Sequence, residues 1–507
     1  MAGLSGDQKK SLHVLAYMLF RMGQEERARK IYAGLVSLAP EGKPDRNALT
    51  GLAAVAISRG EGASALEYLR AAMEGAALSS RRATLLLMKA QALWLEGRIT
   101  EAQVELVNSF IADPDKFLTD FLLTHPDFLA SEIAKGGAGL IIVGATSPDG
   151  KTGRPTVTGL VADSDTFIPG LARLAEGMHK YGAKCGVQLQ HPGRQCAVPR
   201  YNTMSATDMV VKLPWSAGHE IVYENAEEKG KPVRAMTTEE VVEMVDLFSE
   251  AAWRVKQAGF DGVELHAAHG YLISQFMSPY LNKRIDRWGG SFENRTRLLR
   301  ESVQKAMQVC SSDFLVSTRL NIYDGFVYPY GFGVACDGTL TPDYTEPVKL
   351  VKALADEGMP ILNITMGNPY VNPHVNRPFA QGLYEPPEEP LCGVQRMLEG
   401  TAVIKKAVGD IPVICSGLSF LGATAANCAA AYIENGAFDF AGFGRETLAY
   451  PNIAKDIVGN CVDTKKMCIC CGKCSELMRA GGTPGCIVRD AKVYAPMYRE
   501  KVTEAVK

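Results

Sequence analysis

The feature that most constrains the fold is an alternation of short β-branched runs with amphipathic stretches between residues 113 and 443. The runs lie at 139–145, 185–191, 262–268, 314–320, 361–366, 411–416 and 438–443. Strands separated by helices predict parallel βαβ units in an α/β protein. Repetition on this scale favours a TIM-type (β/α)8 barrel over a doubly wound sheet. Seven runs are visible, one fewer than the eight strands of such a barrel.

The first hundred residues contain a repeat of 37 residues. This spacing relates Ala16, Ala53 and Ala90; Gly23, Gly60 and Gly97; and Ala28, Ala65 and Ala102. Each unit is typical of two helices joined by a turn at the glycine. Three such pairs are the minimum for a stable solenoid, and the pattern resembles a tetratricopeptide (TPR) array. An ordinary small helical bundle is the alternative.

Composition excludes several classes of protein. In the 507 residues, 54 Lys and Arg balance 56 Asp and Glu, so nucleic acid or an anionic membrane is not an expected partner. No apolar run approaches the roughly 18–20 residues of a membrane span. Residues 1–10 lack the apolar core of a secretion signal, so a cytoplasmic protein is expected. We predict helical repeats at 1–112, the barrel at 113–460 and a cysteine-rich segment at 461–507.

Polar residues in two of the predicted strands indicate chemistry, because barrel sites form at the carboxyl ends of strands. The amide of Gln188 could be satisfied by a flavin or pyrimidine edge, or by neighbouring backbone. His266 and His269 can converge only if their strand ends or bulges near Ala267. They could then polarise one carbonyl oxygen, and Tyr271 could donate a proton. A zinc site and satisfied core histidines are the alternatives.

The last two runs end in small residues followed by a cation. Ser416 and Gly417 close one run, and Gly444 and Arg445 follow the other. Glycines there allow backbone N–H groups to approach an anion, and Arg445 supplies positive charge. The pattern predicts an anion-binding site.

Two stretches resemble the Old Yellow Enzyme family of flavin oxidoreductases. They are 188–194 and HAAHGYLISQFMSPYLNKRIDRWGGSFENR at 266–295, and the resemblance extends from about Lys116 to Arg499. Members of this family are FMN-binding barrels that reduce the C=C bond of α,β-unsaturated carbonyl compounds. The resemblance therefore implies an NAD(P)H:flavin oxidoreductase with a small unsaturated carbonyl substrate, such as an enone, an enoate or an enoyl thioester.

The resemblance also assigns roles to individual residues. Ala145 and Gln188 would contact the flavin ring, and Arg319 would stabilise the reduced ring, although a structural ion pair is its alternative. His266 and His269 would bind the substrate carbonyl. Tyr271 would protonate the α-carbon after hydride reaches the β-carbon. The phosphate of FMN would lie at the site formed by Ser416, Gly417, Gly444 and Arg445.

Five of the 13 cysteines lie between residues 468 and 486. Cys468, Cys471, Cys474 and Cys486 form a C-x2-C-x2-C-x11-C pattern, which suits a [4Fe–4S] cluster. Zinc or plain reduced thiols are alternatives. The iron–sulfur branch of the family resembles dienoyl-CoA reductase and has one more residue between its second and third cysteines. Electrons would enter from another protein or from a nicotinamide bound directly on FMN.

The family's first strand corresponds to residues 104–112 of this chain. That segment is either a degraded strand or the end of the last repeat helix, and the 37-residue register favours the helix. The barrel is then expected to lack its first strand and to have unpaired sheet edges beside the cofactor.

Two functions therefore follow from the sequence. The first is an FMN-dependent ene-reductase whose helical repeats dock a protein or peptide partner. The alternative is a TPR-type interaction or chaperone protein with an incomplete, inactive barrel. The retained set of polar strand-end residues favours the enzyme, because a scaffold would not require it.

Overall fold

The computed structural model of the chain consists of two compact units, Met1–Pro126 and Asp127–Lys507. It describes residues 5–21, 24–40, 43–73, 82–98, 101–102, 105, 127–154, 159–196, 203–208, 212–214, 220–222, 233–380 and 384–504. The cysteine-rich segment belongs to the same unit as the strands. Within the described residues, no helix has the length and apolar character needed to cross a membrane.

The N-terminal unit is built from helices that pack against their neighbours in chain order. They are α1 (Gly6–Arg21), α2 (Glu25–Ser37), α3 (Arg46–Ser58), α4 (Gly62–Met73) and α5 (Arg82–Leu95). The six alanines of the 37-residue repeat are at most 2% exposed, which lets the helices approach closely. Gly60 and Gly97 have φ values of 76° and 71°, a backbone conformation that glycine adopts at the end of a helix. Gly23 lies outside the described residues.

Most of segment 104–112 also lies outside the described residues. Its one described member, Glu105, is helical. The Glu105 carboxylate accepts a hydrogen bond from Lys89 Nζ at 2.7 Å.

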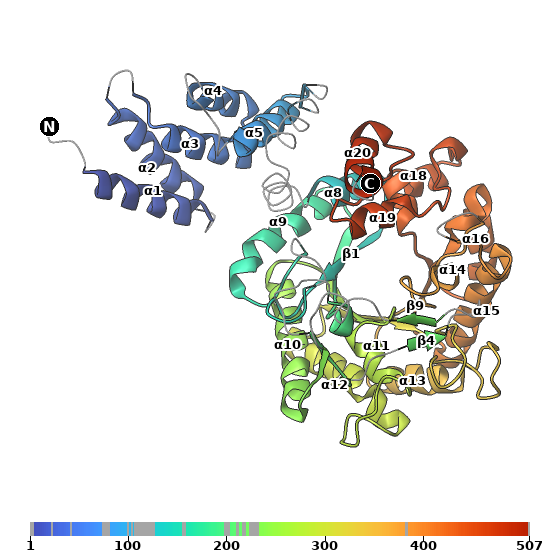
Figure 1. Cartoon of the computed structure of the whole chain (residues 1–507). Helices are drawn as coiled ribbons and strands as arrows, with labels where there is room; N and C mark the ends of the chain where they lie inside the picture. The colour runs from blue at the N-terminus through green and yellow to red at the C-terminus, as the bar shows by residue number, and fades with distance from the viewer. Residues whose placement is uncertain are drawn as a thin grey trace. The chain divides into compact units, whose positions relative to one another are not determined.

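The second unit contains a seven-stranded, entirely parallel sheet in the order β1-β2-β7-β8-β9-β10-β11. Its strands are β1 (Leu140–Thr146), β2 (Lys184–Leu189), β7 (Gly262–Ala267), β8 (Leu315–Asn321), β9 (Leu362–Thr365), β10 (Val413–Cys415) and β11 (Phe440–Ala441). They fall at the seven predicted runs, and the sheet curls inside a ring of helices (Figure 1). This arrangement is consistent with an α/β barrel.

Helices follow the strands and cover the outer face of the sheet. The longer ones are α8 (Asp127–Lys135), α9 (Ile168–His179), α10 (Thr238–Gln257), α12 (Phe292–Cys310), α13 (Thr345–Asp356), α15 (Pro390–Val408) and α16 (Ala425–Glu434). Shorter helices are α11 (Leu272–Met277), α14 (Pro373–Asn376), α17 (Arg445–Ala449), α18 (Ile453–Val458), α19 (Lys473–Arg479) and α20 (Ala491–Tyr498). Single 3-10 turns are η1 (Asp165–Phe167), η2 (Gly193–Gln195) and η4 (Thr464–Lys466), whereas η3 (Leu418–Thr424) is a longer 3-10 segment kinked at Gly422 and η5 (Arg499–Glu504) is a π-helix. Two small ladders, β3 (Thr203–Ser205) with β6 (Val233–Ala235) and β4 (Lys212–Pro214) with β5 (Glu220–Val222), lie outside the main sheet.

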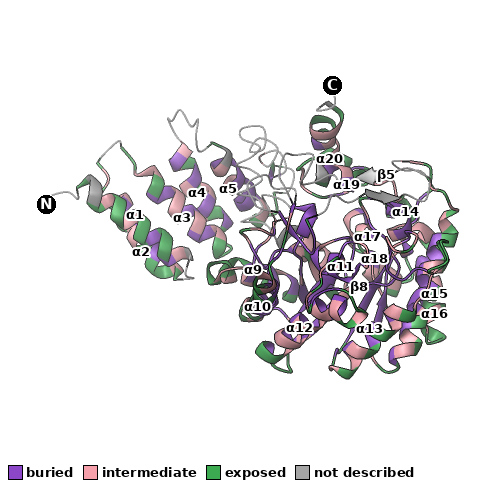
Figure 2. Ribbon diagram, turned by 60° about the horizontal axis from the view of Figure 1, so that its bottom comes forward, coloured by how far each residue is buried: buried purple, intermediate pink, exposed green. Residues whose placement is uncertain are grey.

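Helix α10 illustrates how local sequence produces this layer. Thr237 and Glu240 form a reciprocal capping box at its first turn, which satisfies backbone donors that would otherwise have no partner. Val241, Met244 and Phe248 recur every three or four residues and are fully buried, so one face of the helix packs inward. Figure 2 shows the result for the whole unit, with buried strands inside and exposed helix faces outside.

A main-chain hydrogen bond joins the two ends of the curled sheet, next to its edge strands β1 and β11. The N–H of Lys455, in α18 after β11, donates to the carbonyl of Gly136, just before β1, at 2.8 Å. A Cβ on Gly136 would lie 2.0 Å from the carbonyl oxygen of Pro451. Only glycine permits the backbone at residue 136 to come this close to Pro451. The two ends of the sheet are therefore linked through α18 and not through hydrogen bonds between β1 and β11.

Asp261 anchors the opposite, amino-terminal end of the strands. Its carboxylate accepts hydrogen bonds from His179 Nε2 and Lys184 Nζ, each at 2.7 Å, and from the Cys185 N–H at 2.8 Å. Burial alone would raise the pKa of Asp261, but these donors outweigh it and lower that pKa to about 2. The ionised carboxylate therefore joins α9, β2 and the start of β7.

We expect Asp261→Asn to lower the free energy of unfolding by about 1–3 kcal/mol, because the amide cannot accept all three bonds and its NH2 faces other donors. Urea denaturation at neutral pH measures the loss. Asp165→Asn is the matched control, because Asp165 pairs with Arg254 while 68% exposed, and such pairs contribute at most about 1 kcal/mol. An equal loss in both variants would contradict the anchoring role.

Candidate active site at the carboxyl ends of the strands

The carboxyl end of β1 is bent by a bulge. Its register with β2 shifts between Val143 and Thr146, and Ala145 in the shift has a φ of 59°. A positive φ is uncommon for a non-glycine residue and is often found at functional sites. Gly144 beside it is exposed. A Cβ on Gly144 would have Gln188 Oε1 as its nearest neighbour, at 3.9 Å, so the predicted ring-contacting residues Ala145 and Gln188 border open space.

A network of amides and charges crosses the interior of the sheet. Gln188 Nε2 on β2 donates to Glu264 Oε1 on β7 at 2.6 Å. Asn363 Nδ2 on β9 donates to Glu264 Oε2 at 2.7 Å. Arg319 Nη1 on β8 donates to Asn363 Oδ1 at 2.9 Å. The side chain of Glu264 is 1% exposed, whereas Gln188 and Arg319 are partly exposed and so are accessible from within the barrel.

The predicted phosphate residues meet at the ends of two neighbouring strands. Strand β10 pairs with β11 through Ile414 and Phe440. This pairing brings Ser416 and Gly417, after β10, near Gly444 and Arg445, after β11. Gly417 has a φ of 87°, and a Cβ on Gly444 would meet nothing within 4 Å. Arg319 Nη2 donates to Ser416 Oγ at 3.1 Å, which links this end to the central network.

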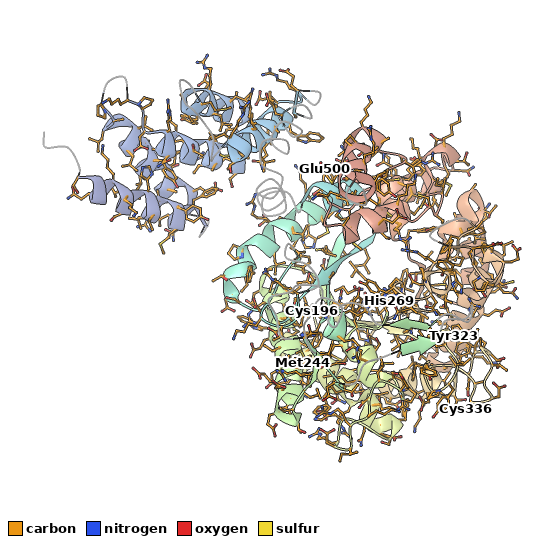
Figure 3. The ribbon with its side chains drawn as sticks, in the orientation of Figure 1. Cys196, Met244, His269, Tyr323, Cys336 and Glu500 are labelled. Atoms are coloured by element: carbon orange, nitrogen blue, oxygen red, sulfur yellow. The ribbon has the colours of Figure 1, made fainter. Side chains whose placement is uncertain are left out.

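The two histidines converge because β7 ends at Ala267. His269 then adopts a φ of 62°, which turns its side chain back beside that of His266. The ring centroids lie 4.9 Å apart, and His269 Nδ1 lies 3.2 Å from His266 Nε2. Both side chains are buried. Figure 3 places His269 inside the ring of helices.

The proton of His269 is fixed by its neighbour Asn376. The Asn376 amide nitrogen can only donate, and it contacts both His269 Nε2 at 2.8 Å and the carbonyl of Met366 at 3.1 Å. His269 Nε2 is therefore an acceptor, and the ring carries its proton on Nδ1. The contact between the histidines is then a hydrogen bond from His269 Nδ1 to His266 Nε2.

Both imidazoles are neutral at physiological pH. Burial lowers the pKa of His266 to about 3, and the charge of Arg319 acts in the same direction. Burial also holds the pKa of His269 well below its usual range, helped by His266, Arg319, Arg377 and Arg445. Neutral rings can donate N–H bonds to an oxygen without adding a titratable charge.

Tyr271 follows the histidines and is the N-cap residue of α11. Its ring centroid lies 5.1 Å from that of His266. Its hydroxyl lies 2.6 Å from the hydroxyl of Tyr370, and the two rings are perpendicular. Tyr370 belongs to the loop after β9, and its backbone N–H donates to Asn368 Oδ1 at 3.0 Å. Asn376 lies a few residues later, at the end of α14, so the segment after β9 supports both Tyr271 and His269.

The predicted metal ligands line one cavity. Cys468, Cys471, Cys474 and Cys486 surround it together with Cys470. Arg445 and Arg489 also line this cavity. The Arg377 guanidinium donates to Ser475 Oγ at 2.9 Å and so joins the cysteine segment to the loop after β9.

Cys468 is biased toward its thiolate. A hydrogen bond from the Cys470 side chain lowers the pKa of Cys468 to about 6 against the effect of burial, and the charges of Arg445 and Arg489 contribute. The backbone N–H of Cys470 also lies 3.4 Å from Cys468 Sγ. Cys470 itself has a φ of 55°. Its side-chain hydrogen bond to Cys468 and its burial raise the pKa of Cys470, so it serves as a donor to its neighbour.

The structure brings all the sequence-predicted barrel residues to one end of the sheet, and it places the cysteine cavity next to them through Arg445. It adds Glu264, Asn363, Tyr370 and Asn376, which the sequence analysis did not identify. Glu264 could have been found, because it lies two residues before His266 in an otherwise apolar strand and so shares its face. The others had no such signal, since their partners lie on other strands or loops.

The buried histidines predict an early loss of stability in acid. An unfolded histidine titrates near pH 6.5, whereas burial lowers the pKa of His266 to about 3 and that of His374 to about 4. The unfolded chain therefore binds more protons than the folded chain as pH falls below about 6.5. Each of these histidines then lowers the free energy of unfolding by up to about 1.4 kcal/mol per pH unit. Urea midpoints at about pH 7 and about pH 5 measure this. His266→Asn should flatten the dependence, and an unchanged slope would contradict it.

Known proteins resemble this chain over a large part of its length. A family model for the NADH:flavin oxidoreductase / NADH oxidase family matches residues 104–333. An NADPH dehydrogenase from Listeria welshimeri is 34% identical over 275 residues, which are 53% of this chain and 71% of the Listeria protein. A cinnamate reductase from Clostridium sporogenes is 31% identical over 387 residues, which are 74% of this chain and 54% of the Clostridium protein.

A solved structure supports the fold. The 6-hydroxypseudooxynicotine amine oxidase from Pseudomonas geniculata N1 superposes with a TM-score of 0.58 at 23% identity, over 73% of this chain and 50% of that protein. The chain spans about half the length of several proteins it matches. The family match, together with the identity to most of the Listeria enzyme, shows that the chain belongs to the NADH:flavin oxidoreductase / NADH oxidase family.

Proposed function

We propose that the chain is an FMN-dependent ene-reductase that uses NAD(P)H and acts on the C=C bond of an α,β-unsaturated carbonyl compound. The observation that carries the proposal is the convergence of two neutral histidines and a tyrosine at the end of β7. The relatives include a cinnamate reductase and an NADPH dehydrogenase, names that agree with this chemistry. An inert scaffold would not require these two histidines and this tyrosine at one strand end.

The residues present fit FMN. Ala145 and Gln188 would border the ring, Arg319 would face its pyrimidine side, and the groups after β10 and β11 would hold the phosphate. The partly exposed guanidinium of Arg319, bonded mainly to neutral acceptors, can offer charge to an anionic ligand. Bound FMN would supply hydride to the β-carbon of the substrate.

The histidines would bind the carbonyl oxygen of the substrate. His269 Nδ1–H now donates to His266 Nε2, and a carbonyl oxygen can replace that acceptor. In this arrangement the neutral His266 ring carries its proton on Nδ1, so it would donate to the same oxygen through Nε2 after that proton moves from Nδ1 to Nε2. Two N–H donors in a buried site stabilise the negative charge that develops on this oxygen.

Tyr271 would give its proton to the α-carbon. The Tyr370 hydroxyl, at 2.6 Å, can donate to the phenolate oxygen that remains. Because Tyr370 is 37% exposed, it also offers a path by which water restores the proton. Hydride and proton together saturate the C=C bond, and no further reactant is needed at this step.

The cysteine cavity would hold a [4Fe–4S] cluster beside the flavin site. Its four cysteines surround one cavity, and the thiolate form that iron requires is favoured at Cys468. We also propose that the N-terminal helices form a TPR-like array that docks a peptide or protein. The buried alanines at 37-residue spacing support this proposal.

Tyr271→Phe should slow reduction of cinnamate by at least about 100-fold, because a general acid contributes about that much. The purified protein should be yellow, and the variant should retain its flavin. Anaerobic stopped-flow spectroscopy of the reduced enzyme mixed with cinnamate measures the rate. Tyr181→Phe, 42% exposed in the wild type, is the control. A colourless protein that cannot be reconstituted with FMN would refute the proposed function.

Anaerobically purified protein should contain about four irons per chain. Cys471→Ser should lose them, because its Sγ would be a ligand. Cys470→Ser, in the same loop, should retain them. Colorimetric iron analysis and the visible spectrum distinguish the variants. Zinc in place of iron, or iron that survives Cys471→Ser but not Cys470→Ser, would overturn the assignment.

A further inference from the structure

We infer that Glu264 is a positioning residue for the flavin, which it orients through the amides of Gln188 and Asn363 and not by contact. The inference rests on the proposed function, because it assumes that FMN binds at this end of the barrel. It assigns a role to a buried carboxylate that none of the proposed steps uses.

The first step is the hydrogen-bond chemistry of the carboxylate. Burial raises the pKa of Glu264, whereas the charge of Arg319 and the two amide hydrogen bonds act in the opposite direction and favour the ionised form. An ionised carboxylate can only accept. Its two oxygens each receive one amide N–H, from Gln188 at 2.6 Å and from Asn363 at 2.7 Å. Either amide rotated by 180° would set oxygen against oxygen. Glu264 therefore determines which end of each amide faces it, and which end faces away.

The second step concerns Gln188. With its nitrogen held by Glu264, its Oε1 remains as an acceptor. Oε1 faces the space beside Gly144, where even an added Cβ would be 3.9 Å away. The pyrimidine edge of oxidised flavin carries an imide N–H, which requires such an acceptor. The carboxylate thus presents the chemically complementary end of the amide.

The third step concerns Arg319. Because Asn363 gives its nitrogen to Glu264, its Oδ1 is free to accept from Arg319 Nη1 at 2.9 Å. Thr365 Oγ1 and Ser416 Oγ accept from Nη2 at 3.3 and 3.1 Å. The guanidinium is held by these oxygens, and the negative charge of Glu264 lies close enough to offset part of its positive charge.

These steps predict two separable effects. Loss of the carboxylate frees both amides to rotate, which weakens binding of oxidised FMN. It also leaves the charge of Arg319 uncompensated, which favours the anionic reduced flavin. The reduced form should therefore lose less affinity than the oxidised form, and the midpoint potential should rise.

The test compares Glu264→Gln with the wild-type chain. We expect the Kd for oxidised FMN, measured by flavin fluorescence, to increase at least tenfold. The factor by which the Kd for reduced FMN increases should be ten times smaller than the factor for oxidised FMN. This tenfold change in the ratio of the two Kd values corresponds to a rise of about 30 mV in the two-electron midpoint potential. Spectroelectrochemical titration measures that potential. Neither readout depends on turnover of a substrate.

Two further variants separate positioning from charge and from folding. Glu264→Asp retains the charge but withdraws the oxygens by one methylene, so it should weaken FMN binding with little change in potential. Asp324→Asn replaces a half-buried carboxylate outside this network, which accepts from the Phe332 N–H at 2.8 Å, and should change neither value. An unchanged Kd and potential in Glu264→Gln would overturn the inference while flavin still binds. Absence of flavin from wild-type protein would instead refute the proposed function.

Discussion

The interior of this barrel depends on placing one guanidinium among parallel strands. Arg319 is too polar to lie there without partners, because removing a charge from water is costly. Its hydrogen bonds reach β9 and the end of β10, while Glu264 supplies the opposite charge and reaches β2 and β9. The resulting network joins five neighbouring strands at one level. Apart from Thr318, whose hydroxyl donates to the carbonyl of Leu265 at 2.9 Å, the alternate positions on the same strands are apolar and buried, so the charged and amide side chains are confined to the inner face.

The same network explains why the candidate site lies at this end. In register, Glu264 is directly opposite Gln188, and His266 is directly opposite Arg319. The carboxyl ends of parallel strands share one rim, so polar side chains that are far apart in sequence become neighbours. The bend at His269 and the loop after β9 then bring donors to the edge of this network. Two neutral rings and two phenols lie next to a fixed positive charge.

Periodicity and motif spacing were sufficient to predict the parallel sheet, its seven strands and the grouping of the polar residues at strand ends. They could not predict which side chains form hydrogen bonds with one another. The orientation of the Gln188 amide depends on Glu264, and the proton position on His269 depends on Asn376, which is more than 100 residues away. Tyr370 lies in a loop with no periodic pattern, so only the folded chain places its hydroxyl beside Tyr271. The closure of the ring through Gly136 was also hidden, because a lone glycine before a strand has many ordinary explanations.

That closure has a consequence for the order in which the barrel assembles. The pairing of β1 with β2 joins residues about 44 apart, Leu140 with Lys184, whereas Lys455 and Gly136 are about 319 apart. The entropic cost of closing a loop rises with the logarithm of its length, so forming the contact between Lys455 and Gly136 costs about 2 kcal/mol more than pairing β1 with β2. A backbone bond at a glycine brings little side-chain burial to offset that difference. We therefore expect the strands to add in sequence from one edge, with the ring sealed last and opened first.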